Sequence, residues 1–388
     1  MDLKSINVGV DATNLRRGGG VTHIVELLSA LDGKPSGVNK VVVFCGSQLA
    51  KKLPTNNWID IITPAALDRG FLHRLIWQKT QLSKSVKKAG CNVLFVPGGV
   101  FSTSFSPVVT MSRNLLPFEF RELSRYGVSW MAVKLLLLRL LQSRSIRKAN
   151  GVIFLTEYAR KTVGAVVKSM DGMVEIIPHG MNSRFDFSPK SQFNVENYSD
   201  RSPYKIIYVS IVEPYKHQWN VVEAVARIRQ EGIPVFLDLV GPAYSPSLQK
   251  LNRVIEELDP AGEWVKYHGA VDYNELNQFY ANADLGVFAS SCENMPNILV
   301  ETMASGLPVA CSNRGPMREI LGDSGLYFDP ENISDITSCL RTYLCDAELR
   351  AEKAKSSYQD SKRYSWELCA KRTFQFLCKV TESRGNKG

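Results

Sequence analysis

Short apolar runs of four to six residues recur along the chain, separated by longer stretches in which apolar and polar residues mix. Runs of this length, bounded by glycine, proline and polar residues, are typical of buried strands in parallel sheets. We therefore predict an α/β protein in which strands alternate with helices. The predicted strands are 6–10, 40–45, 93–96, 108–112, 151–155 and 174–177, then 205–210, 236–240, 265–268, 285–289 and 308–312, and the clearest helices are 21–31, 130–148, 219–229 and 366–380.

The polar run 188–203 contains few apolar residues and is the best candidate for a domain boundary. A chain of 388 residues is long enough for two domains of ordinary size. We expect a first domain over 1–190 and a second over 203–362.

The stretch 290–312 combines two carboxylates with strong helix signals. Glu293 and Glu301 stand eight positions apart, between two of the predicted strands. Pro296 suits the first position of a helix, where its missing N–H costs nothing, and a glycine with a proline just beyond it marks the helix end. The stretch therefore predicts a strand, a loop with Glu293, a short helix with Glu301, and a second strand.

In open parallel sheets, ligands bind outside the carboxyl ends of the strands, and a helix N-terminus there favours an anion. Asn294 or Asn297 could cap this helix. A diphosphate held at the helix N-terminus would leave Glu293 and Glu301 to accept hydroxyls of the groups on either side of it. That layout fits a nucleotide sugar; the alternative is that both acids are solvated helix-start residues. The expected donor-binding residues at the helix start are Met295, Pro296, Asn297 and Ile298.

These residues resemble a known family. The letters ENMPNILVE, followed by MASGLPV, are similar to the E-x7-E motif of the retaining family 4 glycosyltransferases. The resemblance implies the GT-B fold, in which two Rossmann-like, doubly wound domains face each other across a cleft, and here a last helix, 363–380, crosses back to the first domain. It also implies that Glu293 lies near the donor sugar as a catalytic residue, while Glu301 bonds the ribose. Most members have Gly-Phe-Gly where this chain has Asn294-Met295-Pro296, so we expect an altered sugar pocket.

Lys216 stands at the start of the predicted helix 219–229, where the helix dipole disfavours a cation unless an anion binds there. In the resembled family this lysine, together with an arginine that is absent here, grips the donor diphosphate, so Lys216 is the second expected catalytic residue. Ser210 and Gly241, at the ends of two predicted strands, are expected to border the donor.

Gly19 and Gly20 belong to a glycine-rich loop between the first strand and helix 21–31. Such a loop lets backbone N–H groups approach a phosphate, although it is neither a G-x-G-x-x-G nor a P-loop motif. The family has a similar loop that faces its cleft, which makes Gly19 and Gly20 expected donor-binding residues. A purely structural turn is the alternative.

Arg113 and Asn114 follow strand 108–112, where many members of the resembled family carry a histidine. We expect them to be acceptor or cleft residues, and we assign no general base. His179 lies in PHGMN, which resembles the family's segment before the linker, and is expected at a hinge or cleft. His268 ends strand 265–268, near where a base could lie.

The net charge of +9 is unevenly distributed. Residues 1–190 hold 26 Lys and Arg against 12 Asp and Glu, a balance of +14, and the remainder has a balance of −5. The segments 71–88 and 130–148 place basic residues beside Leu, Phe and Trp, which is the composition of a helix lying on anionic lipid. The alternative is a core-facing helix with a solvated basic side. Combined with the basic first half and the resemblance, contact with an anionic membrane surface is the better prediction.

The composition argues against several other classes of protein. Eight cysteines without a C-x-x-C pair predict reduced thiols, mostly in the core of a cytoplasmic protein, and no secretory signal or spanning apolar run is visible. No Asp-x-Asp pair is present, so we expect no metal and no cofactor. A nucleic-acid-binding role for the basic half lacks a recognition motif and would leave the two glutamates unexplained.

The sequence therefore predicts a retaining glycosyltransferase that moves a hexose from a nucleotide-diphosphate sugar, a UDP-sugar first and GDP-mannose second. The expected acceptor is a saccharide or an undecaprenyl-diphosphate-linked saccharide of a surface polysaccharide such as O-antigen or capsule, at the inner face of the cytoplasmic membrane. The alternatives are a non-catalytic, membrane-associated partner subunit with the same fold, and a nucleotide-sugar 2-epimerase.

Overall fold

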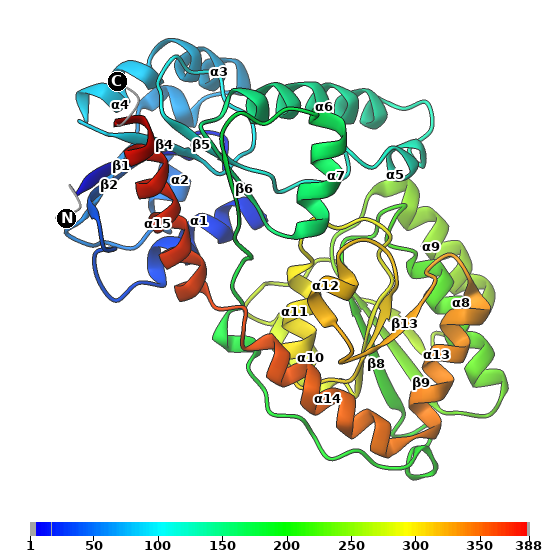
Figure 1. Ribbon diagram of the computed structural model, residues 1–388. Helices are drawn as coiled ribbons and strands as arrows, with labels where there is room; N and C mark the ends of the chain where they lie inside the picture. Colours follow the sequence, from blue (N-terminus) through cyan, green and yellow to red (C-terminus); the bar gives the residue numbers. More distant parts are fainter. Residues whose placement is uncertain (1–4, 17, 386–388) are drawn as a thin grey trace. The chain divides into compact units, whose positions relative to one another are not determined.

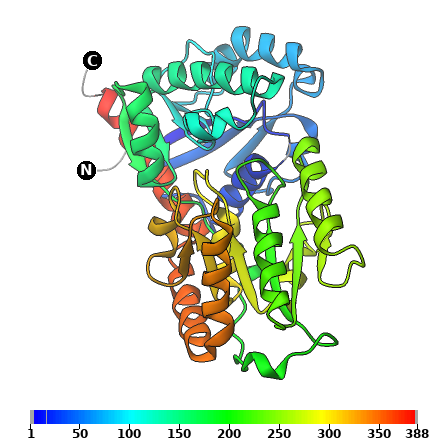
Figure 2. The same ribbon diagram turned by 90° about the vertical axis from the view of Figure 1, so that its right-hand side faces the viewer.

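The computed structural model describes residues 5–16 and 18–385, and the chain divides into two compact units. Unit 1 contains Met1–Phe118, Ser129–Gly180 and Ser365–Gly388, and unit 2 contains Glu119–Val128 and Met181–Tyr364. Each unit is a parallel sheet with helices on both faces (Figures 1 and 2). The predicted α/β class and the two Rossmann-like domains are confirmed.

The sheet of unit 1 has seven parallel strands in the order β3-β2-β1-β4-β5-β6-β7. The strand order reverses between β1 and β4, which is where doubly wound sheets open a crevice. The strands are β1 Ile6–Asp11, β2 Val38–Phe44, β3 Ile59–Ile62, β4 Val93–Val96, β5 Val108–Met111, β6 Gly151–Phe154 and β7 Met173–Ile176. The helices are α1 Gly19–Ser29, α2 Ser47–Ala50, α3 Phe71–Thr80, α4 Leu82–Lys88, α6 Trp130–Lys148, α7 Glu157–Val167 and α15 Trp366–Gly385.

Central strands of unit 1 are buried on both faces, which is why they read as continuous apolar runs. Every residue of β4 and β5 is buried. One core cluster joins β2 and β4 to the helices α3 and α4 through residues such as Phe44, Trp77 and Leu82. Ser129 caps α6 by accepting a hydrogen bond from the Ala132 N–H at 3.2 Å, so this helix begins where the sequence predicts.

The sheet of unit 2 has six parallel strands in the order β10-β9-β8-β11-β12-β13, so its strand order reverses between β8 and β11. The strands are β8 Tyr204–Val209, β9 Val235–Val240, β10 Val265–Tyr267, β11 Leu285–Phe288, β12 Val309–Ser312 and β13 Leu326–Phe328. The helices are α5 Phe120–Ser124, α8 Gln218–Gln230, α9 Ser245–Leu258, α10 Leu276–Asn282, α11 Asn297–Ala304, α12 Met317–Leu321, α13 Ile333–Cys345 and α14 Ala347–Ser361.

Two features of the structure differ from the sequence-based expectations. Strands β3 and β13, of four and three residues, lie at the edges of their sheets and were not among the predicted strands. The units divide at Gly180 and Tyr364, rather than in the polar run 188–203, and Glu119–Val128 belongs to unit 2 although it lies within the expected first domain. The side chains of that segment pair with residues far away in the sequence, which no local pattern reveals.

Candidate functional site

The site in unit 2 forms at the carboxyl ends of β8 and β11, the two strands between which the strand order reverses. The loop after β8 carries Lys216, and the loop after β11 carries Glu293. The predicted strand, loop, helix and strand over 290–312 is confirmed by β11, α11 and β12. Residues more than 70 positions apart are thereby brought to one edge of the sheet, at the place where open α/β sheets bind ligands.

Lys216 and Glu293 form an ion pair, with only 8% and 15% of their side chains exposed. The Lys216 ammonium also lies 5.2 Å from the centre of the Phe288 ring. The Tyr208 hydroxyl donates to the Lys216 carbonyl oxygen at 2.7 Å, which fixes the backbone at this position. The two expected catalytic residues are therefore direct partners within unit 2.

Glu301 is buried one turn inside α11, with 6% of the residue exposed. Burial raises the pKa of Glu301 to about 8, although a hydrogen bond from Tyr273 acts in the opposite direction. The Tyr273 hydroxyl lies 3.1 Å from Oε1, while Oε2 has no hydrogen-bond partner in the described part of the chain. A buried carboxyl oxygen without a partner is costly, and a ligand hydroxyl would satisfy it.

The start of α11 differs in detail from the prediction. Pro296 is the N-cap rather than the first helical residue, so the predicted N-cap residues Asn294 and Asn297 are wrong. Pro296 has no N–H group, and the Asn297 N–H donates to the Met295 carbonyl at 3.1 Å. The predicted row of free N–H groups is thus shortened. Ile298 lies in the first turn and packs on the core beside β8 and β9.

Ser210 and Gly241 contact each other at the ends of neighbouring strands. The Ser210 hydroxyl accepts a hydrogen bond from Gln218 at 2.7 Å and donates to the Ile211 carbonyl. Gly241 has a φ of +144°, and a Cβ atom there would lie 2.2 Å from the Ser210 carbonyl oxygen. Both residues shape the loop before Lys216, and their donor contact stays a prediction.

His268 lines a hollow of about 680 Å³ with Lys205, Asp238 and Lys266, and none of Lys216, Glu293 or Glu301 lines it. Its Nε2 lies 2.6 Å from the Asp238 carboxylate. This aspartate engages one of the two ring nitrogens and so orients the imidazole. The expectation that His268 lies near a base position gains no support from these contacts.

In unit 1, two separate motifs meet. Arg113, after β5, lies against the glycine loop, and a Cβ atom on Gly20 would be 2.9 Å from its guanidinium, with Gly19 also adjacent. Burial lowers the pKa of Arg113 to about 10. No carboxylate forms an ion pair with Arg113 within the described residues, and its buried Nε has no hydrogen-bond partner there. An unneutralised guanidinium beside a helix N-terminus favours an anion.

Asn114 and His179, the other residues of unit 1 that were expected in the acceptor site or cleft, contact neighbouring residues of the same unit. Asn114 accepts a hydrogen bond from the Leu116 N–H at 3.1 Å and stabilises a turn. His179 is buried, and its ring stacks on Trp366 with 5.4 Å between ring centres. His23, which the sequence gave no reason to single out, is fully buried 4.8 Å from the His179 ring. Burial, aided by the neighbouring His179, lowers the pKa of His23 well below its usual value.

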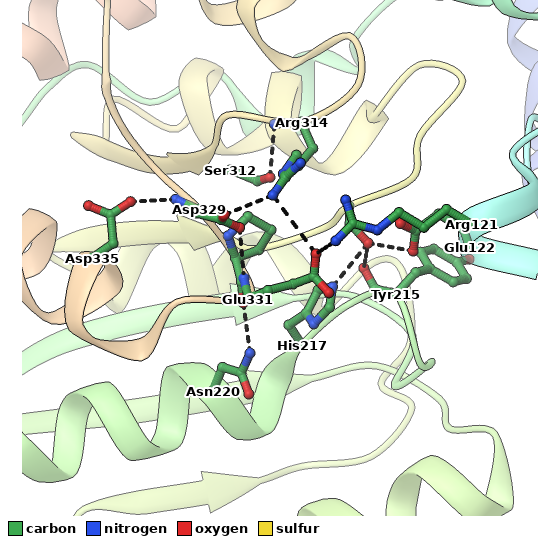
Figure 3. A network of polar contacts seen from close by, with 12 residues as sticks. Arg121, Glu122, Tyr215, His217, Asn220, Ser312, Arg314, Asp329, Glu331 and Asp335 are labelled. Carbon is green, nitrogen blue, oxygen red and sulfur yellow. Dashed lines mark hydrogen bonds and ion pairs between the residues drawn. The ribbon is translucent and has the colours of Figure 1, made fainter. Parts of the chain in front are cut away.

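A network of polar contacts that the sequence did not reveal supports the two loops of the unit 2 site (Figure 3). Arg121 and Arg125 both pair with Glu331, and Arg125 also pairs with the buried Glu122. Glu122 accepts a hydrogen bond from the Ser291 hydroxyl. The network therefore reaches the loop that carries Glu293, two residues further along the chain.

His217 completes the network from the Lys216 side. Its Nε2 lies 3.0 Å from the Ser291 hydroxyl oxygen, and burial lowers the pKa of His217 to about 4. Because the Ser291 hydroxyl donates to Glu122, the neutral ring must donate its Nε2–H to Ser291. This direction excludes activation of Ser291 as a nucleophile by His217. The contacts position the loops and provide no second reaction centre.

The described residues include neither a metal cluster nor a membrane-spanning helix. No group of three or more His, Cys, Asp and Glu side chains could hold a metal ion. None of the helices is both long enough and apolar enough to cross a membrane.

Residues 190–360 match the family described as "Glycosyl transferases group 1". The chain is 33% identical over 167 residues to the O-antigen chain mannosyltransferase B of Escherichia coli. The matched stretch is 43% of this chain and 44% of the E. coli protein, so the match spans less than half the length of that relative.

Solved structures share the fold over nearly the whole chain. Sucrose-phosphate synthase of Thermosynechococcus elongatus has a TM-score of 0.75 at 17% identity, covering 97% of this chain and all of that one. HepE of Anabaena, solved in complex with UDP, has a TM-score of 0.70 at 16% identity, covering 96% and 100%. The chain thus has the GT-B fold, and its residues 190–360 are similar to the glycosyltransferase group 1 family.

Proposed function

We propose that this protein is a retaining glycosyltransferase that moves a hexose from a nucleotide-diphosphate sugar to a saccharide or lipid-linked saccharide of a surface polysaccharide. The observation that carries the proposal is the ion pair between Lys216 and Glu293 where the strand order of unit 2 reverses. The E. coli relative, named as an O-antigen chain mannosyltransferase, supports the polysaccharide context.

Lys216 would stabilise the leaving diphosphate. Negative charge gathers on that group as the bond to the anomeric carbon breaks, and a preorganised cation in a water-poor site stabilises it where it develops. Lys216 is suited to this role because its ammonium is buried and held in place by a single carboxylate. An incoming diphosphate would compete with Glu293 for Lys216.

Glu293 would then face the donor sugar. Its carboxylate can accept sugar hydroxyls and favour positive charge at the anomeric centre, as carboxylates do in glycoside chemistry. In this proposal the acceptor attacks from the face that the phosphate leaves, and no covalent enzyme intermediate forms. Glu301 would bind the ribose, with the unpartnered Oε2 meeting a ribose hydroxyl.

Donor identity is tested by measuring nucleoside-diphosphate release from UDP-, GDP-, ADP- and dTDP-sugars, with calorimetric binding of each donor alongside. We expect one donor to bind and turn over, a UDP-sugar or GDP-mannose. NMR of the anomeric proton of the product would show the donor's configuration retained. If no nucleotide sugar bound, the transferase proposal would fail in favour of a non-catalytic subunit. Conversion of the donor sugar to its 2-epimer would favour the epimerase.

We also propose that unit 1 contacts an anionic lipid surface through α3 and α6, where it would meet an undecaprenyl-linked acceptor. The buried face of α6 combines the polar residues Gln142, Ser143 and Ser145 with Leu135 and Ile146, whereas four other leucines are exposed. A core-facing helix would show the reverse, so this alternative does not explain α6. The exposed apolar side chains are Trp130, Val133, Leu136, Leu137, Leu140 and Leu141 on α6, and Phe71, Leu72, Leu75 and Ile76 on α3.

Basic residues accompany this apolar surface. Lys134, Arg144 and Lys148 are exposed on α6 itself. Apolar side chains that enter the headgroup region beside cations bind anionic lipid. We expect the protein to float with vesicles containing phosphatidylglycerol and to remain behind with pure phosphatidylcholine. Leu140→Glu should abolish flotation, whereas Leu368→Glu, at an exposed leucine of α15 in the same unit, should not. Equal flotation of both variants would contradict this proposal.

A further inference from the structure

A second hollow in unit 2, of about 560 Å³, lies at the start of α9, and none of Lys216, Glu293 or Glu301 lines it. Hollows of this size accommodate small organic ligands. Part of its wall is formed by the apolar rings of Tyr126, Tyr244 and Pro246. The centres of the two tyrosine rings lie 5.8 Å apart. Helices α8 and α9 lie side by side here (Figure 1).

The N-terminus of α9 is a favourable place for an anion. This helix has 14 residues, and its N-cap residue Tyr244 gives it no side-chain hydrogen bond. The first N–H groups of an α-helix have no acceptor within the helix, and because Pro246 has no N–H, those of Ser245 and Ser247 remain here. Together with the helix dipole, they attract negative charge.

Ser247 provides an independent sign of a missing ligand. It lies in the first turn of α9 and lines the hollow, although only 5% of the residue is exposed. Within the described residues, its hydroxyl has no hydrogen-bond partner. Because Ser247 lines the hollow, an oxygen atom of a ligand there would pair with its hydroxyl.

Lys250 brings a positive charge to the same place. It lies three positions after Ser247, on the same face of α9, and lines the hollow. Its ammonium is held 3.9 Å from the centre of the Trp219 ring. No carboxylate in the described part of the chain forms an ion pair with it, whereas the neighbouring Arg125 is already paired with Glu122 and Glu331.

We propose that this hollow binds a phosphorylated saccharide, separately from the donor site. The phosphate would lie at the N-terminus of α9 and accept hydrogen bonds from Ser247 and Lys250. Tyr244 and Pro246 would pack against the apolar face of the sugar ring. Phosphate suits the position because its oxygens can satisfy the helix N–H groups, the hydroxyl and the ammonium together.

The test is titration calorimetry of the full chain with glucose 6-phosphate as the probe, and with glucose, inorganic phosphate and glucuronate as separate probes. We expect glucose 6-phosphate to bind most tightly. Ser247→Ala and Lys250→Gln should each weaken this binding at least about tenfold. Arg253→Gln, at an exposed residue of the same helix, should leave it unchanged. Lys216→Ala should also leave it unchanged, because that residue belongs to the donor site.

Four results would overturn the proposal. The first is no binding of glucose 6-phosphate by the unmodified protein, and the second is unchanged affinity in both Ser247→Ala and Lys250→Gln. The third is loss of binding in Lys216→Ala, which would place the phosphate at the donor site. Inorganic phosphate or glucuronate binding at least as tightly as glucose 6-phosphate is the fourth, since it would refute the recognition of a phosphorylated ring. None of these results depends on whether the protein transfers a sugar.

Discussion

Ser291 donates a hydrogen bond to the carboxylate of Glu122 at 2.7 Å, although 169 positions separate the two residues. This contact is one of those that tie Glu119–Val128 to unit 2. It also anchors the loop that carries Glu293, because Ser291 stands two residues before it. Glu122 in turn is paired with Arg125, so one buried carboxylate holds two groups.

Glu122→Ala should therefore destabilise the protein. Ser291 and Arg125 would each lose one of their partners in a buried setting, which costs about 2–4 kcal/mol in similar cases. Urea unfolding measures this change in the free energy of unfolding. Glu256→Ala, at an exposed residue of α9, should change it by less than about 0.5 kcal/mol. Equal effects of the two substitutions would show that the Glu122 contacts do not stabilise unit 2.

Glu301 should make stability depend on pH. Burial raises its pKa to about 8 from an ordinary value of 4.5. Between those values the folded protein keeps a proton that the unfolded chain releases, so the free energy of unfolding falls as pH rises through this window. Below the window both states are protonated, and this contribution to stability is complete.

Glu301→Gln removes that titration. Relative to the unmodified protein, we expect the variant to gain stability between about pH 4.5 and 8, by an amount on the order of a few kcal/mol. Urea unfolding at both pH values measures the gain. Glu257→Gln, at an exposed residue of α9, serves as the control. A pH dependence of Glu301→Gln that matched the unmodified protein would contradict the assigned pKa.

Gly241 should not tolerate a side chain. Its φ of +144° strains any other residue, and the new Cβ would meet the Ser210 carbonyl oxygen. We expect Gly241→Ala to cost more than about 3 kcal/mol of unfolding free energy. Gly262 also has positive φ, at +69°, but has open space around it. Gly262→Ala should cost only about 1–2 kcal/mol, and thermal unfolding should separate the two variants. A similar loss in both would mean that the close approach at Gly241 has no energetic effect.

Local patterns were sufficient for the main parts of the fold and of the site. The strands around Glu293 are apolar runs with clear ends, and α6 starts and ends where the sequence predicts. Lys216 and Glu293 were expected in one site through the resemblance to the family's motifs, and they meet because the carboxyl ends of parallel strands lie at one edge of a sheet.

The long-range contacts could not be predicted from the sequence. The pairing of Arg121 and Arg125 with Glu331 depends on the tertiary fold and has no local signal. The caps of α11 were wrong because Pro296 itself occupies the N-cap position. His268 looked available at a strand end, yet Asp238 on the neighbouring strand contacts its ring.

The central claim is that the Lys216 and Glu293 pair carries out the chemistry of a glycosyltransferase. The most direct test is the turnover rate with the identified donor in Lys216→Ala and Glu293→Ala. Lys362→Ala is the matched control, since Lys362 forms an exposed ion pair with Asp186 in the same unit. We predict that both site variants lose at least about a hundredfold in kcat while remaining folded, and that the control keeps the full rate. Normal turnover in either folded site variant would contradict the account.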